Sequence, residues 1–262
     1  RDNGKGLLVA GSPGLSGAAV MASCAALRGG IGTLKTIVTA SVAGAMAVLP
    51  EAMCVAYPGG DWEDGAAEFI QPYVDEATAL AIGPGLGRGA GREALLRAAL
   101  AAKKPAVVDA DGLYALSNIE NKRALLHGGI ILTPHLGEME RLTGIPAREI
   151  GARQEDIARR YAAEWGCAVL LKNYESVVAA PDGRLARNAT GNPGLAKGGS
   201  GDVLAGLVLA LLGQGLEPFD AACAGAYLLG ASADEAMRLL SERMLMARDV
   251  IEAIETTLEQ FK

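Results

Sequence analysis

The stretch that decides the fold reads Asn188-Ala-Thr-Gly-Asn-Pro-Gly-Leu-Ala-Lys-Gly-Gly-Ser-Gly-Asp202, and an apolar run over residues 203–212 follows it. This pattern is typical of a glycine-rich loop that enters the N-terminus of a helix. Such a helix start leaves four backbone N–H groups free and carries the positive end of the helix dipole. Glycines also let the backbone approach a phosphate closely. The stretch therefore predicts an anion-binding loop followed by a buried helix.

Asp202 ends this loop, and its carboxylate has two interpretations. A carboxylate beside an anion hole repels the phosphate that the hole attracts. This arrangement makes sense if Asp202 takes a proton from a hydroxyl group that lies near the phosphate. Alternatively, Ser200 and Asp202 simply cap the helix, a task that both residue types perform well. Capping and catalysis are compatible, so the loop by itself does not decide between them.

The composition sets limits on the class of protein. The chain has 262 residues, half of them hydrophobic, and a formal net charge of -6. This length suits one large core, so we expect a single domain over residues 1–262. The acidic balance and the scattered Lys and Arg residues do not suggest a nucleic-acid surface. No stretch reaches about 18 uninterrupted apolar residues, so no membrane span is expected.

The cysteines and the first residues indicate the cellular compartment in which the protein is expected. The four cysteines lie far apart in apolar contexts and form no CxxC motif. They are typical of buried free thiols in a reducing environment. The first six residues lack the pattern of a signal peptide. We therefore expect a cytoplasmic location.

Hydrophobic periodicity predicts strands that alternate with helices. Strands are expected at residues 7–10, 33–38, 53–56, 79–82, 106–108, 129–132 and 168–171, and helices at 17–28 (with Ser16 as N-cap), 42–48, 62–74, 92–102, 149–165, 203–212, 218–237 and 246–261. The strands are near-continuous apolar runs, as in a parallel sheet covered on both faces. Residues 177–180 and 185–187 predict a hairpin. We therefore predict a doubly wound α/β fold with a mostly parallel sheet, helices on both faces and a small antiparallel edge hairpin.

Polar or glycine-rich groups follow nearly every predicted strand. They are Gly11-Ser12, Gly83-Pro-Gly85, Asp109 with Asp111, His135 with Glu138, Lys172, and the 188–202 loop. In open α/β sheets, ligands bind beyond the carboxyl ends of the strands. Because these groups would share one edge of the sheet, we predict a cleft there.

Each of these side chains has a functional and a structural interpretation. His135 either contacts a ligand or shapes its loop, and its position at a strand end favours the ligand. Asp109 and Asp111 either cap the following helix or touch a sugar hydroxyl. Glu138 either holds a Mg²⁺-bound water or satisfies loop amides. Lys172 either contacts a phosphate or is solvated.

Two familiar nucleotide motifs are weak or absent. Gly85-x-Gly87-x-x-Ala90 follows a strand and precedes a helix, which matches the dinucleotide-binding fingerprint in outline. However, Pro84 interrupts the loop and the unit is not the first βαβ of the chain, so a Rossmann site is not favoured. No G-x-x-x-x-G-K-[ST] occurs, which excludes a P-loop. Two histidines are too few for a three-His metal site, and the sequence leaves the ligands of a metal open.

The ordered set of motifs resembles the ADP-dependent NAD(P)H-hydrate dehydratases, a family with a ribokinase-like fold. The matching segments are Ala10-Gly-Ser-Pro-Gly-Leu-Ser-Gly-Ala18, Gly83-Pro-Gly-Leu-Gly87, Asp109-Ala-Asp111, Leu132-Thr-Pro-His-Leu-Gly-Glu138, Leu171-Lys172 and the 188–202 loop. They run in the family's order over nearly the whole chain. The chain resembles the stand-alone bacterial form, or the C-terminal half of the bifunctional form whose N-terminal half is an epimerase.

This resemblance implies the repair of NADH or NADPH that has been hydrated at C6. ADP in bacteria, or ATP in eukaryotic members, would phosphorylate the C6 hydroxyl with the help of Mg²⁺, and loss of phosphate would restore the nicotinamide ring. Asp202 would be the general base. The amides that would stabilise the transferring phosphoryl group are those of Gly198, Gly199, Ser200 and Gly201. The family also implies a homo-oligomer, specifically a tetramer.

The resemblance also assigns residues to two subsites. The hydrate pocket would contain Ala18, Gly83, Gly85, His135 and Asp202, and the adenine-nucleotide site would contain Lys172, Asn173, Tyr174, Glu175, Ser176 and Gly201. Further candidates are Asp109, Glu138, Asn188 and Asn192. Asn173 stands where the family has Gly, and Asn also tolerates a positive φ. Leu136 and Ala189 replace family prolines, and Glu175 places a charge near the expected nucleotide.

Two other functions fit part of the pattern. A small-molecule kinase of the ribokinase-like superfamily would share the Gly-Gly-Ser-Gly-Asp loop, but it would not need Thr133-Pro-His-Leu-Gly-Glu138. A non-catalytic sensor of adenine nucleotides would keep the pocket without turnover. The intact Asp202 and its loop argue against the sensor, because together they support phosphoryl transfer directly.

Overall fold

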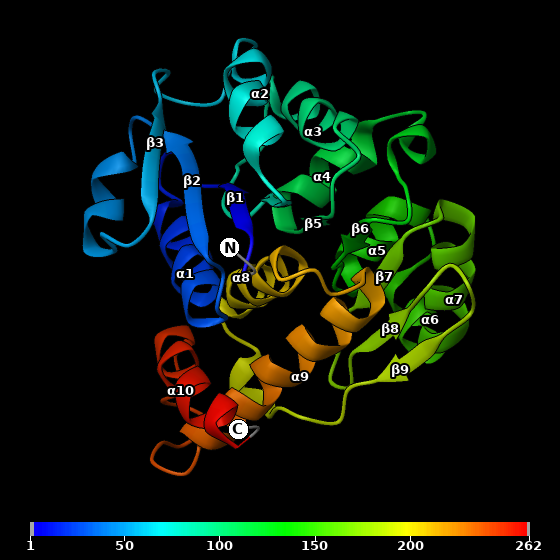
Figure 1. Cartoon of the computed structure of the whole chain (residues 1–262). Coiled ribbons are helices and arrows are strands. Elements are labelled where there is room, and N and C mark those ends of the chain that lie inside the picture. Colours follow the sequence, from blue (N-terminus) through cyan, green and yellow to red (C-terminus); the bar gives the residue numbers. More distant parts are fainter. Residues whose placement is uncertain (1–2, 261–262) are drawn as a thin grey trace.

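A single nine-stranded sheet forms the centre of the molecule in a computed structural model that describes residues 3–260 (Figure 1). Its strands are β1 (Lys5–Val9), β2 (Thr33–Thr39), β3 (Met53–Tyr57), β4 (Ala79–Ile82), β5 (Ala106–Val108), β6 (Ile130–Leu132), β7 (Ala168–Leu171), β8 (Val177–Ala179) and β9 (Leu185–Arg187). Their order is β3-β2-β1-β4-β5-β6-β7-β8-β9. β1 to β7 pair in parallel, whereas β8 and β9 pair antiparallel. The predicted parallel sheet with its edge hairpin is confirmed.

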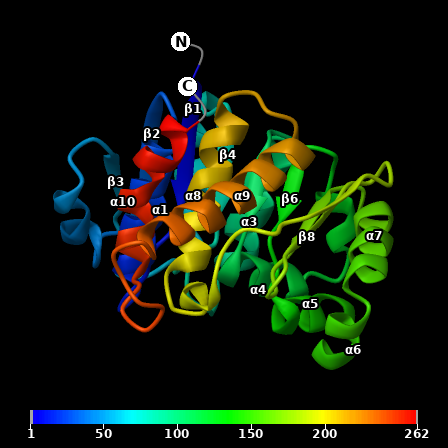
Figure 2. The same ribbon diagram turned by 90° about the horizontal axis from the view of Figure 1, so that it is seen from below.

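Helices cover both faces of this sheet. They are α1 (Ser16–Arg28), α2 (Ala66–Glu76), α3 (Arg92–Ala101), α4 (Ala110–Asn118), α5 (Leu136–Thr143), α6 (Ala147–Ala152), α7 (Gln154–Trp165), α8 (Ser200–Gly213), α9 (Pro218–Ala236) and α10 (Ala247–Glu259), with short 3-10 helices η1 (Ala43–Val48), η2 (Lys122–Leu125) and η3 (Pro193–Leu195). Alternate residues of β1 show the two layers. Leu7 and Val9 pack in the core beneath α2, α3, α4, α5 and α7, whereas Leu8 packs in the core beneath α1, α8 and α9. Figure 2 shows α1, α8 and α9 together on one side of the sheet.

Helix α8 is the most buried helix of the layer it shares with α1 and α9, which explains its long apolar run. Nearly all of its residues are buried, since it lies between the sheet and its neighbouring helices. The backbones of α1 and α8 approach closely at Gly206, where a Cβ atom would lie 2.2 Å from the carbonyl oxygen of Ala22. This packing fixes the N-terminus of α8 at the carboxyl end of the sheet. The strand order reverses between β1 and β4, the place where ligands bind in such sheets.

Several predicted boundaries differ from the structure. The helix predicted at 149–165 is two helices, α6 and α7, with a break at Arg153 where φ is -131°. Leu15, and not Ser16, is the N-cap of α1. Helices α4 and α5 have no counterpart among the predicted helix ranges, because nine and eight residues are too few for a clear period. Residues 1, 2 and 261, the last being the predicted end of the final helix, lie outside the described residues. Between residues 3 and 260 no helix is both long and apolar enough to span a bilayer.

Candidate active site

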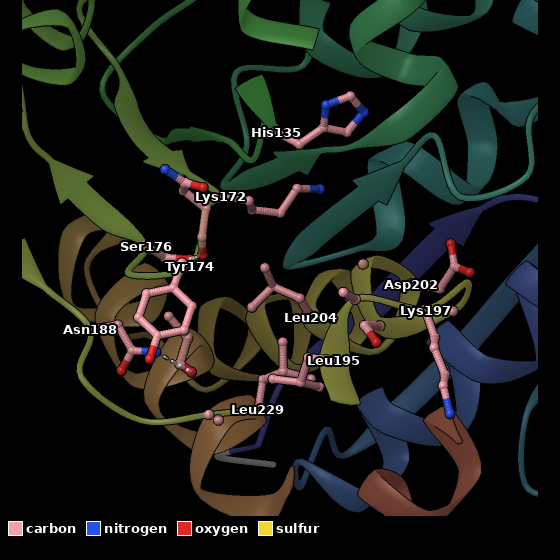
Figure 3. Close-up of a pocket in the computed structure, with 18 of the residues that line it drawn as sticks. His135, Lys172, Tyr174, Ser176, Asn188, Leu195, Lys197, Asp202, Leu204 and Leu229 are labelled. Atoms are coloured by element: carbon pink, nitrogen blue, oxygen red, sulfur yellow. Dashed lines mark hydrogen bonds between the residues drawn. The ribbon is translucent and has the colours of Figure 1, made fainter. Parts of the chain in front are cut away.

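A cleft of about 710 Å³ opens at the carboxyl ends of β5, β6 and β7 (Figure 3). One wall carries the residues that follow these strands, including Asp109, His135 and Lys172. The opposite wall is the 188–202 loop with the first turn of α8 and one side of α9. The volume lies within the usual range for pockets that bind small molecules. The structure thus brings into one cleft groups that are separated by up to about half the chain.

Lys172 is the centre of a buried polar network in this cleft. Its Nζ donates to Oδ1 of Asp109 at 2.7 Å and lies 3.9 Å from Oε2 of Glu138. Thr133 donates its hydroxyl to the same Oδ1 of Asp109 at 2.7 Å. Burial lowers the pKa of Lys172, but the carboxylates of Asp109 and Glu138 outweigh burial and raise that pKa above its usual value. Lys172 is therefore charged and fixed in position by carboxylates, and it is not simply solvated. A lysine that contacts a phosphate must be charged and directed at it in this way.

Asp109 serves this network and does not cap the helix that follows it. It occupies the N-cap position of α4, but its carboxylate makes no capping hydrogen bond to the first turn in the described structure. Only 3% of its side chain is exposed. The next residue, Ala110, has φ 47°, in the left-handed region, which costs a non-glycine residue about 1 kcal/mol or more. The backbone is thus held in a strained turn where Asp109 meets Lys172.

Glu138 and His135 form a reciprocal cap at the start of α5. Nδ1 of His135 accepts the N–H groups of Gly137 and Glu138 at 3.0 and 3.3 Å, while Oε2 of Glu138 accepts the N–H of His135 at 2.8 Å. Both residues therefore shape their loop, as the structural interpretation has it. His135 still has one ring nitrogen that is free to contact a ligand. Because Nδ1 is an acceptor, the proton of the neutral imidazole is on Nε2, at the rim of the cleft. Burial and Lys172 lower the pKa of His135, which keeps it neutral.

The end of the glycine loop and the first turn of α8 carry a set of free donors. Its N-cap is Gly199, with φ 99°, and no side chain caps it in the part of the chain that the structure describes. Capping by Ser200 or Asp202 is therefore wrong as an explanation of the loop. The donors left free, which find no protein acceptor within residues 3–260, are the N–H groups of Gly198, Gly199, Ser200 and Gly201. This set can bind an anion at the helix N-terminus.

Asp202 lies on the same turn of α8. Burial raises the pKa of its carboxyl to about 7; Asp109 adds to this effect and Lys172 opposes it. A base whose pKa lies near neutrality is well matched to proton transfer at physiological pH. Within residues 3–260, the Asp202 carboxylate makes no hydrogen bond or ion pair that would hold it in another role. A Cβ atom on neighbouring Gly201 would lie 3.6 Å from Nζ of Lys172, so the first turn of α8 passes close to this cation.

Two asparagines of the loop act through its shape. Oδ1 of Asn188 accepts the hydroxyl of Thr190 at 2.9 Å, and Oδ1 of Asn192 accepts the N–H of Gly194 at 3.0 Å. Both side chains border the cleft. Lys197 only resembles a P-loop lysine, and its side chain points away from Lys172 and His135 (Figure 3). It donates its Nζ to the carbonyl oxygens of Arg243 and Leu245 at 2.6 and 2.7 Å. The loop is therefore anchored to the segment between α9 and α10.

The segment after β7 is held by a residue that sequence reasoning missed. Gln154 donates to the carbonyl oxygens of Leu171 and Glu175 at 3.0 Å and accepts from Asn173 at 3.1 Å. These bonds fix the start of α7, which accounts for the break before it. No local pattern marks Gln154, because its partners are distant in sequence. The non-glycine residues with positive φ between 3 and 260 are Lys103 and Ala110, so Asn173 does not use the glycine-like conformation.

Glu175 does not direct its charge into the cleft. Its carboxylate accepts from Arg187 of β9 at 2.9 Å, and it does not line the cavity. Tyr174 and Ser176 do line it, and the side chain of Tyr174 is largely exposed over it. The segment can therefore border a nucleotide without repelling its phosphates.

The predicted hydrate residues Ala18, Gly83 and Gly85 gather beside the cleft and are not part of its lining. A Cβ atom on Gly85 would lie 2.8 Å from Cβ of Ala18, and one on Gly83 would lie 1.8 Å from the carbonyl oxygen of Asp109. They lie at the strand-order reversal, next to the Asp109 network. In the same segment the N–H of Gly87 donates to Asp111 at 2.9 Å. The N–H of Gly87 is therefore already bonded to a carboxylate, whereas a Rossmann site would need this N–H to bind a pyrophosphate.

The described residues contain no group of three or more His, Cys, Asp or Glu side chains arranged to hold a metal ion. Mg²⁺ does not need such a group, since it commonly binds one or two carboxylates together with phosphates and waters. Glu138 meets that condition beside Lys172. Burial raises the pKa of Glu138 to about 7, and a nearby cation would favour its charged form. The site therefore fits a Mg²⁺ ion that is bound mainly through a nucleotide.

Comparison with known proteins gives consistent results. A family model described as NAD(P)H-hydrate dehydratase matches residues 6–256. The bifunctional NAD(P)H-hydrate repair enzyme of Moorella thermoacetica is 43% identical over 254 residues, covering 95% of this chain and 48% of that protein. The ADP-dependent (S)-NAD(P)H-hydrate dehydratase of Neisseria meningitidis is 39% identical over 237 residues, covering 87% of this chain and 75% of that protein.

A solved structure gives the same result in three dimensions. The ADP/ATP-dependent NAD(P)H-hydrate dehydratase from Bacillus subtilis, co-crystallised with ATP/Mg²⁺, superposes with a TM-score of 0.88 and 33% identity. The match covers 100% of this chain and 91% of that chain. The chain spans about half the length of the bifunctional relatives it matches.

Proposed function

The chain belongs to the NAD(P)H-hydrate dehydratase family, and we propose that it converts hydrated NADH or NADPH back to the reduced cofactor at the expense of ADP or ATP. The observation that carries this proposal is the first turn of α8. There, four free N–H groups at the start of the helix lie beside the unbonded carboxylate of Asp202, and Gly201 brings this turn close to Lys172. This turn can hold a phosphate and accept a proton beside it.

The first chemical step is a phosphoryl transfer. The adenine nucleotide would occupy the wall formed by Lys172, Tyr174 and Ser176, with its terminal phosphate at the N-terminus of α8. The C6 hydroxyl oxygen of the hydrate attacks the terminal phosphorus while its proton passes to Asp202. AMP leaves if ADP is the donor, and ADP leaves if ATP is the donor. The free amides and Lys172 stabilise the charge on the transferring group.

The second step is an elimination. The C6–O bond of the phosphorylated hydrate breaks with its electron pair leaving on phosphate, and a proton passes from C5 to water, so that the C5–C6 double bond forms again. Phosphate leaves far more readily than hydroxide, which is why a nucleotide is consumed for what is formally a loss of water. The overall reaction is that of a carbon–oxygen lyase. Ala18, Gly83, Gly85 and His135 would surround the hydrated ring beside Asp202.

Mg²⁺ would be held by the nucleotide phosphates and, through water, by Glu138. When bound, it neutralises charge on the phosphates and so favours their approach to the acidic side chains of the cleft. Lys172 performs part of the same task permanently, because Asp109 keeps it charged and in place.

The proposal includes three further features of the protein. One domain is supported by the single sheet that contains every described strand. A cytoplasmic location is supported by the four cysteines, all of which are free thiols. A homotetramer is supported by exposed apolar side chains at the β3 edge of the sheet, such as Val48 and Met53. Light scattering of the purified protein tests the tetramer.

Product analysis tests the function against a small-molecule kinase. Incubation with NADH-hydrate, Mg²⁺ and ADP should release inorganic phosphate and NADH in equal amounts. A kinase would instead accumulate a phosphorylated product and release no phosphate. Nucleotide binding without turnover of any hydrate or alcohol would indicate a sensor. The hydroxyethylthiazole kinase from Pyrococcus horikoshii, at 17% identity, is similar in fold, and that likeness says nothing about activity.

A further inference from the structure

Two arginines flank one tyrosine beside the cleft. Arg88 follows the glycine turn after β4, Tyr114 lies on α4 and Arg141 lies on α5. The Cζ atom of Arg88 is 4.4 Å from the centre of the Tyr114 ring, and that of Arg141 is 5.3 Å from it. Both distances are within the range of cation–π contacts, so both guanidinium groups contact the same ring. We call these three residues the Arg–Tyr–Arg patch.

The patch adjoins the hydrate side of the site. Arg88 is next to Gly87, whose N–H binds Asp111, and Nε of Arg88 lies 3.6 Å from the carboxylate of Asp111. Asp111 in turn contributes to the raised pKa of Asp202. On the other side, the charge of Arg141 lowers the pKa of His135. Arg141 therefore lies within electrostatic range of His135, and Arg88 contacts Asp111, a carboxylate within range of Asp202.

The positive charge of the patch is poorly compensated by the protein. Arg141 forms no ion pair with a carboxylate within residues 3–260, and Arg88 meets Asp111 only through Nε. The two like charges repel each other only weakly, because both arginine side chains are exposed to solvent and their donors are open to a ligand. A bound anion would remove that repulsion. The fork of donors on a guanidinium matches phosphate oxygens in particular, and a stacked guanidinium is already oriented for them.

We propose that the Arg–Tyr–Arg patch binds phosphate groups of the dinucleotide substrate, beyond the subsite that holds its hydrated ring. The inference rests on the proposed function, which places that ring between the Gly83 turn, His135 and Asp202. In NADH and NADPH the pyrophosphate lies one ribose away from the nicotinamide, and NADPH carries a further 2′-phosphate. Either group offers the oxygens that the patch recognises. Comparison of the two hydrates separates these sources.

The test uses Arg88→Gln, Arg141→Gln and the double variant, assayed with both hydrates and with ADP. A lost charge-assisted hydrogen bond to phosphate should raise the KM for the hydrate roughly 10-fold or more per arginine. The kcat and the KM for ADP should stay at wild-type values. Equal increases for both hydrates indicate the pyrophosphate, whereas an increase confined to NADPH-hydrate indicates the 2′-phosphate. Arg160→Gln is the matched control, because Arg160 stacks on Tyr161 of α7 at 5.2 Å, away from the cleft.

Two results would overturn the proposal. One is an unchanged KM for both hydrates in the double variant, and the other is an equal rise in the KM for ADP. Calorimetric titration with NADPH keeps the inference separate from the proposed function, since it needs no turnover. Weaker NADPH binding by the double variant supports the patch even if the wild type dehydrates nothing. Equal NADPH affinity of the two proteins, or no NADPH binding by the wild type, overturns the patch whatever the activity.

Discussion

Replacing Asp202 by Asn should abolish most turnover and yet make the protein more stable. The Asn side chain has nearly the same volume but cannot accept the proton of the C6 hydroxyl. Turnover should fall by about 10² or more, the usual effect of a lost general base. Nucleotide binding should remain near that of the wild type, because the free amides of α8 and Lys172 are unchanged.

The stability effect follows from the pKa of Asp202. That pKa rises from 3.8 to about 7 on folding, mainly because of burial. Between these values the folded chain binds a proton that the unfolded chain has lost, so the associated stability is lost as the pH rises through 7. The shift corresponds to roughly 4 kcal/mol at most, since each pKa unit is worth about 1.4 kcal/mol. Asp202→Asn removes this cost above pH 7 and has little effect on stability below pH 4.

Urea unfolding of both proteins at pH 8 and at pH 4, together with hydrate turnover and ADP titration, measures these effects. The wild-type kcat/KM should also fall as the pH drops below about 7, because Asp202 must be charged to accept a proton. Wild-type turnover in the variant would refute the role of Asp202. A variant that is less stable than the wild type at pH 8 would refute the burial of a charged carboxyl as the cause of the raised pKa.

Three further predictions concern the loop and its surroundings. Gly199→Ala should destabilise the fold by about 1–3 kcal/mol in thermal melts, because residue 199 has φ 99° and its Cβ would lie 2.6 Å from Met21. The neighbouring variant Gly201→Ala should melt like the wild type but raise the KM for ADP. His135→Asn should keep a capping acceptor and melt like the wild type while weakening hydrate binding more than ADP binding, and equal weakening of both would indicate a purely structural histidine. Lys197→Met should destabilise the loop anchor by about 1–3 kcal/mol and raise the KM for ADP, and Lys197→Arg should restore both.

The parts of the fold that were predictable are those that depend on local burial. The apolar runs of β4, β5 and β7 are continuous because both faces of the sheet are covered, so their bounds could be found from composition alone. The prediction that the polar residues after the strands share one edge of the sheet required only the geometry of parallel strands. Helix α8 was evident because a helix buried on nearly all sides is apolar over its whole length.

The parts that were not predictable depend on partners distant in sequence. Lys172 is held by Asp109, 63 residues earlier, and no local pattern shows whether a lysine at a strand end meets a carboxylate or water. The break between α6 and α7 exists because Gln154 binds the segment after β7. Helical periodicity does not register such a contact, so it predicts one continuous helix. Likewise, the compensation of Glu175 by Arg187 required the register of β8 and β9.

The most direct test of the proposed chemistry follows the C6 oxygen atom. NADH-hydrate labelled with oxygen-18 at the C6 hydroxyl would be incubated with the protein, Mg²⁺ and either ADP or ATP, and the released phosphate would be analysed by mass spectrometry. Because the hydroxyl oxygen attacks the terminal phosphorus and leaves with it, the label should appear in inorganic phosphate as NADH forms. Label that appears in water, or unlabelled phosphate released beside NADH, would contradict phosphorylation of the hydrate at the α8 turn.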